Sequence, residues 1–307
     1  MSMKVIYEGV DIYPDISVNR CYHTMFAEKN SDELLLRLND TRQLWQRWNP
    51  KKGDKIAVED GNAKSGTMFV DSVTPSSGFL TLRAYSMPPT VKDKRSKSWE
   101  QVKFLQLVNE IAETHGLTVL TYGLQDQTYN FVAQNNEPDF DFLYKRCILE
   151  GVAFIVYDEQ LILYLQSFME GQAAGEVLKI TNAYDFEYKD NGDKAYGSCE
   201  VKNGSVVGTF SAGRGSKALH TVLPLSMSSE LEANRFAQNL LRDVNKNMTT
   251  AVIHTDYMAR NIAPGSNVTL NTEGASGWDG KAFVTQVRHD YVKTKSKIWL
   301  RKPLEGY

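Results

Sequence analysis

Cysteine is scarce in this sequence, and its placement excludes two kinds of covalent framework. The 307 residues contain three cysteines, Cys21, Cys147 and Cys199, an odd number separated by long stretches of chain. A disulfide framework or a CxxC metal site needs closely paired cysteines, so neither is expected. The pattern is typical of a protein that folds in a reducing compartment.

Long apolar runs and an excess of charge are also missing, and we expect no secretory leader. No stretch approaches the roughly 20 apolar residues that span a bilayer, and the opening residues, MSMKVIY, lead directly into strand-like sequence. The formal net charge is -2, which gives no general attraction to nucleic acid. We therefore expect no membrane segment and no nucleic-acid binding.

The sequence shows no recognisable catalytic or metal-binding pattern. Cys21 and His23 share a strand face by their spacing, but no nucleophile signature such as GxSxG surrounds any serine. The five histidines lack HxH or HxxxH spacing. Two acidic pairs have simpler roles at a helix start or on a polar helix face: Asp139 with Asp141, and Glu110 with Glu113. We predict no catalytic residue, no metal site and no cofactor, and thus not an enzyme.

What the chain does contain is strand-like sequence at both ends. In residues 1–90, a strong hairpin signal at Asp60-Gly61-Asn62 separates two of several short apolar or alternating runs. Such closely spaced short strands predict a small barrel-like domain. The runs are 5–7, 16–18, 34–38, 55–59, 67–73 and 79–85.

The central part, residues 91–175, is expected to combine helices with strands. A serine with a glutamine three residues later, Ser98 and Gln101, has the pattern of a capping box. A proline in the first turn, Pro138, favours a second helix start. The elements predicted here are an exposed basic loop at 86–97, a helix at 98–115, a helix at 138–150 and a hairpin at 152–165.

Residues 176–307 are expected to form a second β domain that includes one helix. Ser228 and Ser229 can cap a helix at 229–246, and the glycines from Gly204 to Gly215 suggest a mobile loop. The closing strands are predicted at 251–255, 267–270, 282–291 and 297–301. The predicted class is therefore α+β and mostly β, with β-rich ends and a central α+β portion.

Four stretches together resemble the phage late control protein D family, the baseplate hub proteins of contractile tails. They are WQRWNPKKGDKI at 45–56, SWEQVKFLQLVNEIAETHGL at 98–117, the acidic helix start and hairpin at 131–165, and the glycine and valine pattern from Pro264 to His289. The hub module of type VI secretion spike proteins is similar. The resemblance runs in order along nearly the whole chain.

This resemblance implies two tube-type β-barrel domains, formed by the N- and C-terminal parts. It implies a homo-trimer whose two barrels per chain form a pseudo-six-fold ring between the tail tube and a trimeric spike. The implied partners are the spike protein, the tail tube protein and other baseplate (wedge) proteins. The implied location is a virion or a phage-tail-like bacteriocin particle, assembled in the cytoplasm of the bacterial host.

A ring subunit must offer surface and strand edges to its neighbours. We expect strands near 55–59, 67–73, 282–291 and 297–301 to be such edges. Trp45 and Trp48 could instead stack on sugars, so a carbohydrate- or receptor-binding module remains an alternative, as does a tail-associated peptidoglycan hydrolase. The candidate interface residues are Trp45, Trp48, Ile56, Val58, Phe69, Phe283, Val287 and Trp299.

Overall fold

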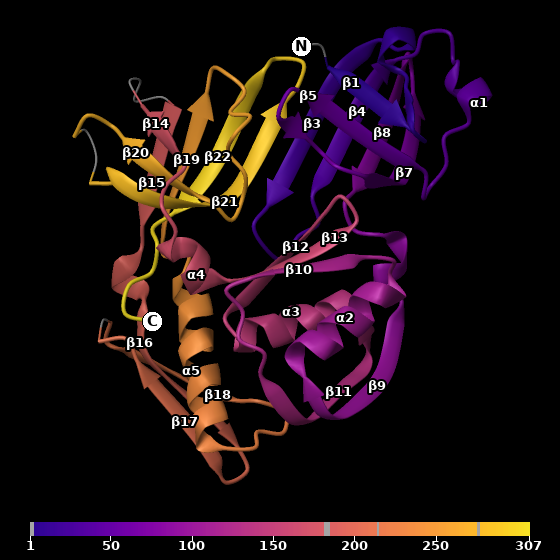
Figure 1. Ribbon diagram of the computed structural model, residues 1–307. Coiled ribbons are helices and arrows are strands. Elements are labelled where there is room, and N and C mark those ends of the chain that lie inside the picture. Colours follow the sequence, from indigo (N-terminus) through magenta and orange to yellow (C-terminus); the bar gives the residue numbers. More distant parts are fainter. Residues whose placement is uncertain (1–2, 181–184, 214, 275–276) are drawn as a thin grey trace.

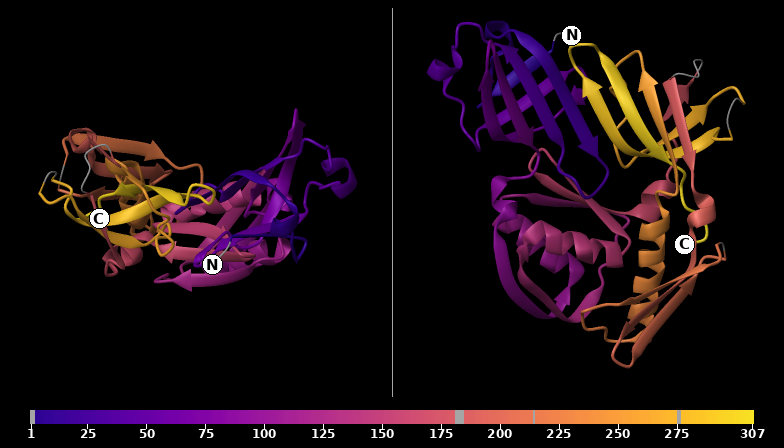
Figure 2. Two further views of the ribbon diagram at one scale, coloured as in Figure 1. Left: turned by 90° about the horizontal axis from the view of Figure 1, so that it is seen from above. Right: turned by 180° about the vertical axis from the view of Figure 1, so that it is seen from behind.

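The computed structural model describes residues 3–180, 185–213, 215–274 and 277–307. Strands dominate, and helices concentrate in the middle of the chain (Figure 1). The prediction of a mostly β, α+β protein is confirmed. Two sheet halves lie side by side at one end of the molecule, and two smaller mixed units lie below them, as Figure 1 and the right-hand view of Figure 2 show.

The N-terminal sheet half is built around the buried faces of alternating strands. Leu34, Leu36 and Leu38 point into its core from one strand, and Leu80 and Leu82 point inward from the next. Its elements are β1 (Lys4–Tyr7), β2 (Val10–Asp11), η1 (Tyr13–Asp15), β3 (Val18–Phe26), β4 (Glu33–Asn39), α1 (Trp45–Trp48), β5 (Lys55–Asp60), β6 (Ala63–Lys64), β7 (Met68–Ser76) and β8 (Phe79–Tyr85).

The central unit follows, with two helices packed against a small sheet. Apolar residues at helical spacing, such as Leu107, Val108 and Ile111, bury one face of the first helix. The elements are η2 (Pro89–Lys92), β9 (Lys94–Lys103), α2 (Phe104–Thr114), β10 (Thr118–Tyr122), β11 (Thr128–Pro138), α3 (Asp139–Leu149), β12 (Val152–Tyr157), β13 (Gln160–Leu165) and α4 (Gln166–Gly171).

The remaining residues form the C-terminal sheet half and a unit inserted into it. The sheet half contains β14 (Glu176–Lys179), β15 (Phe186–Asp190), β19 (Thr249–Thr255), β20 (Asn267–Asn271), β21 (Gly280–Asp290) and β22 (Lys295–Arg301). The inserted α5 unit contains η4 (Gly192–Lys194), β16 (Tyr196–Asn203), β17 (Val206–Ser211), β18 (Lys217–Val222) and α5 (Glu230–Asn245).

The α5 unit shares its core with the central unit. Phe236 and Leu241 of α5 belong to the same buried cluster as Phe142 and Leu143 of α3. Gly208 lets β17 approach α5 closely, because an added Cβ there would lie 2.1 Å from the Ala233 backbone. The sequence analysis grouped this segment with the C-terminal strands, whereas its apolar helix face packs toward the central unit.

One 14-stranded sheet runs through both sheet halves. Its order is β15-β19-β22-β21-β3-β4-β8-β7-β5-β1-β2, with β14, β20 and β6 paired off this path. Within the described residues none of the sheets closes into a barrel, so the two tube-type barrels stay a prediction. The antiparallel pairing of β21 with β3 joins the halves, and we call this pairing the seam.

The expected sheet edges are mostly wrong. The strand at 55–59 is β5, which pairs with β1 and β7. The strands at 282–291 and 297–301 are β21 and β22, and both have partners on either side. The strand at 67–73 is β7, which pairs with β8 throughout but with β5 only at its start. Among the described residues, the strands with a single partner are instead β2 and β15, at the ends of this path, and β14 and β6, which branch off it.

Three local predictions also fail. The helix expected at 98–115 begins only at Phe104, because residues 94–103 form β9 and pair with the distant strand β11. The basic stretch at 86–97 is therefore largely strand and 3-10 helix rather than loop. Half of the mobile loop expected from Gly204 to Gly215 is strand β17, paired with β16; Arg214 lies outside the described residues.

Candidate functional site: junctions between the parts and free ends of the sheet

The suspected Cys-His pair lies in the wall of the seam rather than in an open site. Cys21 and His23 are both fully buried on β3. Burial, aided by the charge of Asp290, raises the pKa of the Cys21 thiol well above its ordinary value. Burial lowers the pKa of His23 to about 3. A protonated thiol in the interior is not a nucleophile.

Two of the acidic residues singled out in the sequence, Asp139 and Glu110, have structural partners in the central unit. The Asp139 carboxylate accepts a hydrogen bond from Gln134 Nε2 at 2.8 Å and lies 2.8 Å from His115 Nε2. Glu110 accepts a hydrogen bond from Trp99 Nε1 at 2.9 Å. These contacts account for the carboxylates structurally. In the described ranges, no group of three or more His, Cys, Asp or Glu side chains is arranged to hold a metal ion.

The seam is a short antiparallel pairing reinforced by two arginines. Residues 22–26 of β3 face residues 286–290 of β21. Arg288 Nε donates to Thr24 Oγ1 at 3.0 Å across it. Arg260 Nη2 lies 2.7 Å from the Asp60 carboxylate, and its Nε donates to the Asp60 carbonyl at 3.1 Å. Two ion-pairing and hydrogen-bonding side chains thus tie the C-terminal half to the N-terminal half.

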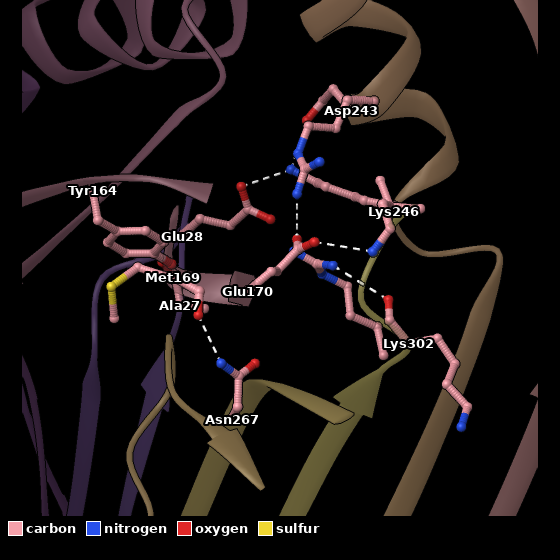
Figure 3. A network of polar contacts seen from close by, with 12 residues as sticks. Ala27, Glu28, Tyr164, Met169, Glu170, Asp243, Lys246, Asn267 and Lys302 are labelled. Atoms are coloured by element: carbon pink, nitrogen blue, oxygen red, sulfur yellow. Dashed lines mark hydrogen bonds and ion pairs between the residues drawn. The ribbon is translucent and has the colours of Figure 1, made fainter. Parts of the chain in front are cut away.

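A buried ion network connects the sheet halves to the α5 unit (Figure 3). At its centre Glu170, at the end of α4, is 5% exposed. Its carboxylate pairs with Arg242 Nη2 of α5 at 2.6 Å and with Arg301 Nη2 of β22. The backbone N–H of Leu304 also donates to it, at 2.9 Å. One carboxylate therefore links three separate segments of the chain.

A second buried charge lies beside the first in the same view (Figure 3). Lys246 follows α5 and is 5% exposed. Its Nζ lies 2.6 Å from Glu28, which follows β3, and 2.6 Å from Asp243 of α5. The α5 unit is thereby also tied to the N-terminal sheet half.

Two neutral hydrogen bonds complete the junction. Tyr164 Oη of β13 donates to the carbonyl of Ala27. Asn267 Nδ2 of β20 donates to the carbonyl of Met169 at 2.7 Å. Figure 3 shows Tyr164, Met169 and Asn267 gathered on one side of Glu170. Every part of the chain therefore contributes to this junction, which fixes how the units sit relative to one another.

The sequence analysis missed this network, although one signal was present. Arg242 directly follows Leu241, which belongs to the apolar stripe of α5, so helical spacing already places the arginine near the buried face. The partners could not be found from the sequence, because Glu170 and Arg301 are 131 positions apart.

The eight predicted interface residues are distributed over both sheet halves and are not brought together. Ile56, Val58, Phe283 and Val287 are buried within the chain's own cores, and Phe283 lies under the Arg301 guanidinium at 4.3 Å. The other four, Trp45, Trp48, Phe69 and Trp299, are only half-buried. Whether any of them contacts a neighbouring chain stays a prediction.

Trp45 and Trp48 line an open apolar pocket of about 350 Å³ near α1. Leu44, half exposed, forms part of its rim. Trp48 also packs edge-on against Tyr7 of β1, with ring centroids 4.7 Å apart. The pair therefore has one side in the core and one side open to solvent.

Both ends of the large sheet expose apolar side chains. At the N-terminal end Val10 of β2 is 63% exposed, and Tyr13 beside it is 37% exposed. At the C-terminal end Val177 of β14 is 56% exposed and Tyr188 of β15 is 47% exposed. Outer strands with unpaired backbone groups and exposed apolar side chains are the features of surfaces that pair with another chain.

The comparisons with known proteins concern the fold alone. No family model matches the sequence, and no curated protein is recognisably similar to it. Solved structures do match, along nearly the full chain. The 43 kDa tail protein of prophage MuSo2 from Shewanella oneidensis has a TM-score of 0.74 at 13% identity, covering 99% of this chain and 98% of that one.

Two further structures extend this likeness. A tail protein from Neisseria meningitidis has a TM-score of 0.74 at 12% identity, covering 98% of this chain and 96% of that one. An Escherichia coli component of the type VI secretion system, described as structurally similar to the T4 bacteriophage tail proteins gp27 and gp5, has a TM-score of 0.62. It is 10% identical and matches over 99% of this chain and 78% of its own. The chain thus has the fold of phage tail proteins.

Proposed function

We propose that this chain is a structural subunit of the baseplate hub of a contractile phage tail or a phage-tail-like bacteriocin. The observation that carries the proposal is the likeness to phage tail proteins over nearly the whole length of both chains. A likeness of this extent includes both sheet halves and the two smaller units, rather than one common module. The late control protein D family is the family we propose.

The continuous sheet supports assembly into a ring. Each copy brings two sheet halves joined at the seam, so three copies would supply six similar wall segments. The outer strands β2 and β15 carry backbone groups with no strand partner in the described residues. Pairing the C-terminal end of one copy with the N-terminal end of the next would satisfy these groups and cover the exposed apolar side chains.

The buried junction at Glu170 suits a subunit that transmits load. It fixes the α5 unit and the central unit beneath the sheet through charge-assisted contacts that are shielded from water. In this proposal the ring, with its two tube-type barrels per chain, connects the tail tube to a trimeric spike. Other baseplate proteins would bind outside it, in a particle assembled in the bacterial cytoplasm.

The proposal describes a protein without catalytic activity. A tail-associated peptidoglycan hydrolase would show clearing of peptidoglycan in a zymogram, and that result would contradict our reading. The open Trp45 and Trp48 pocket favours a second candidate, a carbohydrate- or receptor-binding module. Saturable glycan binding that is lost in the Trp45→Ala variant would support that alternative.

Mass measurement in solution tests the hub directly. We expect the purified chain, mixed with the spike protein of its own particle, to form a complex with three copies of each chain. Electron microscopy of that complex should show a ring with pseudo-six-fold symmetry. A complex of any other stoichiometry, or no complex with the spike and the tube protein together, would rule out the hub assignment.

A further inference from the structure

Two buried histidines face each other across the seam. His23 of β3 and His289 of β21 are register partners, so their side chains project from the same face of the sheet. They are 0% and 2% exposed. His289 Nδ1 lies 2.8 Å from Ser296 Oγ, whereas neither ring nitrogen of His23 has a hydrogen-bond partner among the described residues.

A buried carboxyl group stands close to this pair. Asp32, just before β4, is 6% exposed, and its Oδ2 lies 4.0 Å from His23 Nε2. Its other oxygen accepts a hydrogen bond from the Phe26 backbone N–H at 2.9 Å. Asp32 and His289 both line a pocket of about 240 Å³ between the sheet halves.

The remaining charged groups around the seam are already paired or lie on its far side. Arg260 opposes a positive charge on His289 and is itself paired with Asp60. Asp290 acts on the Cys21 thiol. The other titratable groups nearby are Lys64 of β6, Tyr157 of β12 and Tyr291, which directly follows β21. None of them is a hydrogen-bond partner of His23.

The surroundings keep both histidines neutral. Burial, with a smaller contribution from the neighbouring His289, lowers the pKa of His23 to about 3. Burial, with a smaller contribution from the positive charge of Arg260, lowers the pKa of His289 to about 4. Exposed to water, both rings would return to 6.5, so between about pH 4 and 6.5 an open seam holds two more protons on them than a closed one.

Asp32 acts in the opposite direction. Burial raises its pKa from 3.8 to about 8, so between those values the closed seam holds one proton more than the open seam. Two histidines that take up protons on opening therefore compete with one carboxyl group that releases a proton. Opening the seam therefore takes up one net proton between about pH 4 and 6.5, so the open form becomes more favourable as the pH falls through this range.

We propose that the seam is an acid-sensitive joint, at which protonation of His23 and His289 separates β21 from β3 while each half keeps its own sheet. The seam consists of five facing residue pairs, extended by backbone hydrogen bonds from Ala27 N–H to the Thr285 carbonyl at 2.9 Å and from Tyr291 N–H to the Cys21 carbonyl at 3.0 Å. What distinguishes it from the seven-pair β4–β8 pairing is therefore the facing pair of buried histidines, and not its length. In a ring, opening of this joint by acid would separate the two wall segments within each copy. This consequence rests on the proposed hub function.

Hydrogen–deuterium exchange of the full chain, corrected for the intrinsic effect of pH, tests the joint. From about pH 7 to pH 5, amides in residues 22–26 and 286–290 should open about tenfold more often, because one net proton is taken up. Amides of β4 and β8 should keep their protection. The control is His254→Leu, which removes an exposed histidine on β19 and should behave like the wild type.

Two variants should change the sign and the size of this response. His23→Leu removes one proton-binding group, so acid should no longer open the seam and should slightly tighten it. Asp32→Asn removes the opposing group, so the seam of this variant should open at least about a hundredfold more often at pH 5 than at pH 7. If all three proteins open equally with acid, or if the seam and β4 lose protection together, the joint does not exist.

A measurement on the wild type covers the case in which a variant does not fold. In nuclear magnetic resonance spectra, His23 and His289 should remain neutral down to about pH 5 in the closed form. Protonation of either ring above about pH 6 without extra exchange at the seam would overturn the proposal. Ring formation is measured separately at neutral pH, so a chain that forms no ring refutes the hub but leaves the seam result standing.

Discussion

At the scale of single residues, the strongest constraint on this fold is buried charge. Burial alone would raise the pKa of Glu170, but Arg301 and Arg242 outweigh it and hold the pKa below its ordinary value. Glu170 therefore contributes stability that is present at neutral pH and is lost as the pH falls below about 4.5. Two guanidinium groups in the interior depend on this one carboxylate.

Removing that charge should be costly. Glu170→Gln leaves Arg242 and Arg301 buried without a counter-charge, and we expect it to lower the free energy of unfolding by about 3–5 kcal/mol. The matched control is Glu159→Gln, at an ion pair with Lys55 in which both side chains are about half exposed. It should cost less than about 1 kcal/mol. Urea denaturation of both variants measures the difference, and equal losses would contradict the role given to the network.

The sequence predicts the core of this protein better than its junctions. Leu34, Leu36 and Val58 are recognisable because alternation within one strand marks the inward face. Glu170 and Lys246 look like ordinary surface residues, because their partners come from segments far away in the chain. Buried polar contacts of this kind are a property of the tertiary structure and leave little local pattern.

At the scale of elements, the start of α2 shows how a distant strand overrides a local signal. Ser98 and Gln101 match a capping box, but they lie in β9, where Ser98 faces Ala133 of β11. The helix begins after Lys103, which has extended backbone angles and no side-chain cap. Asp126, from the loop before β11, accepts a hydrogen bond from the Leu105 N–H at 2.9 Å instead.

This assignment predicts which residue the helix needs. Asp126→Ala should lower the free energy of unfolding by about 0.5–2 kcal/mol, because a backbone N–H in the first turn loses its acceptor. Ser98→Ala, at an exposed strand position, should change it by less than about 0.5 kcal/mol. Chemical denaturation of the two variants decides between them. A larger loss from Ser98→Ala would mean that the helix starts where the capping box lies.

Elements with both a clear period and a local cap are visible in the sequence. For α5, Ser229 accepts a hydrogen bond from the Glu232 N–H at the helix start, and the apolar stripe follows at helical spacing. Strands β9 and β17 are different, because β9 is largely exposed and strongly charged and β17 shows no clean alternation of buried and exposed residues. Their conformation is determined by pairing with β11 and β16, which no pattern within the strand reveals.

At the scale of the whole molecule, the order of strands decides which surfaces are free. The sequence indicates strands at 55–59 and 297–301 but cannot show that both lie inside the sheet. The free strands are short or unremarkable in sequence: β2 has two residues, β14 has four and β15 has five. A search for edges by hydrophobicity therefore favours the interior strands, whose two partners bury them most completely.

The free ends give the hub proposal its sharpest test. Val10→Asp and Val177→Asp each place a charge on an exposed apolar side chain at opposite ends of the sheet, so both should leave the isolated chain folded but reduce ring formation at least about tenfold. Val222→Asp is the matched control, because Val222 is 74% exposed but lies on β18 of the α5 unit, outside the large sheet.

The readout is native mass at neutral pH, with circular dichroism to verify folding. Loss of the ring in both end variants, with assembly unchanged in Val222→Asp, would show that the sheet ends carry the contact between copies. Loss in only one of them would mean that the other end faces a different partner. Normal assembly of both end variants would refute end-to-end pairing, since a buried carboxylate without a counter-charge is not tolerated at a packed interface.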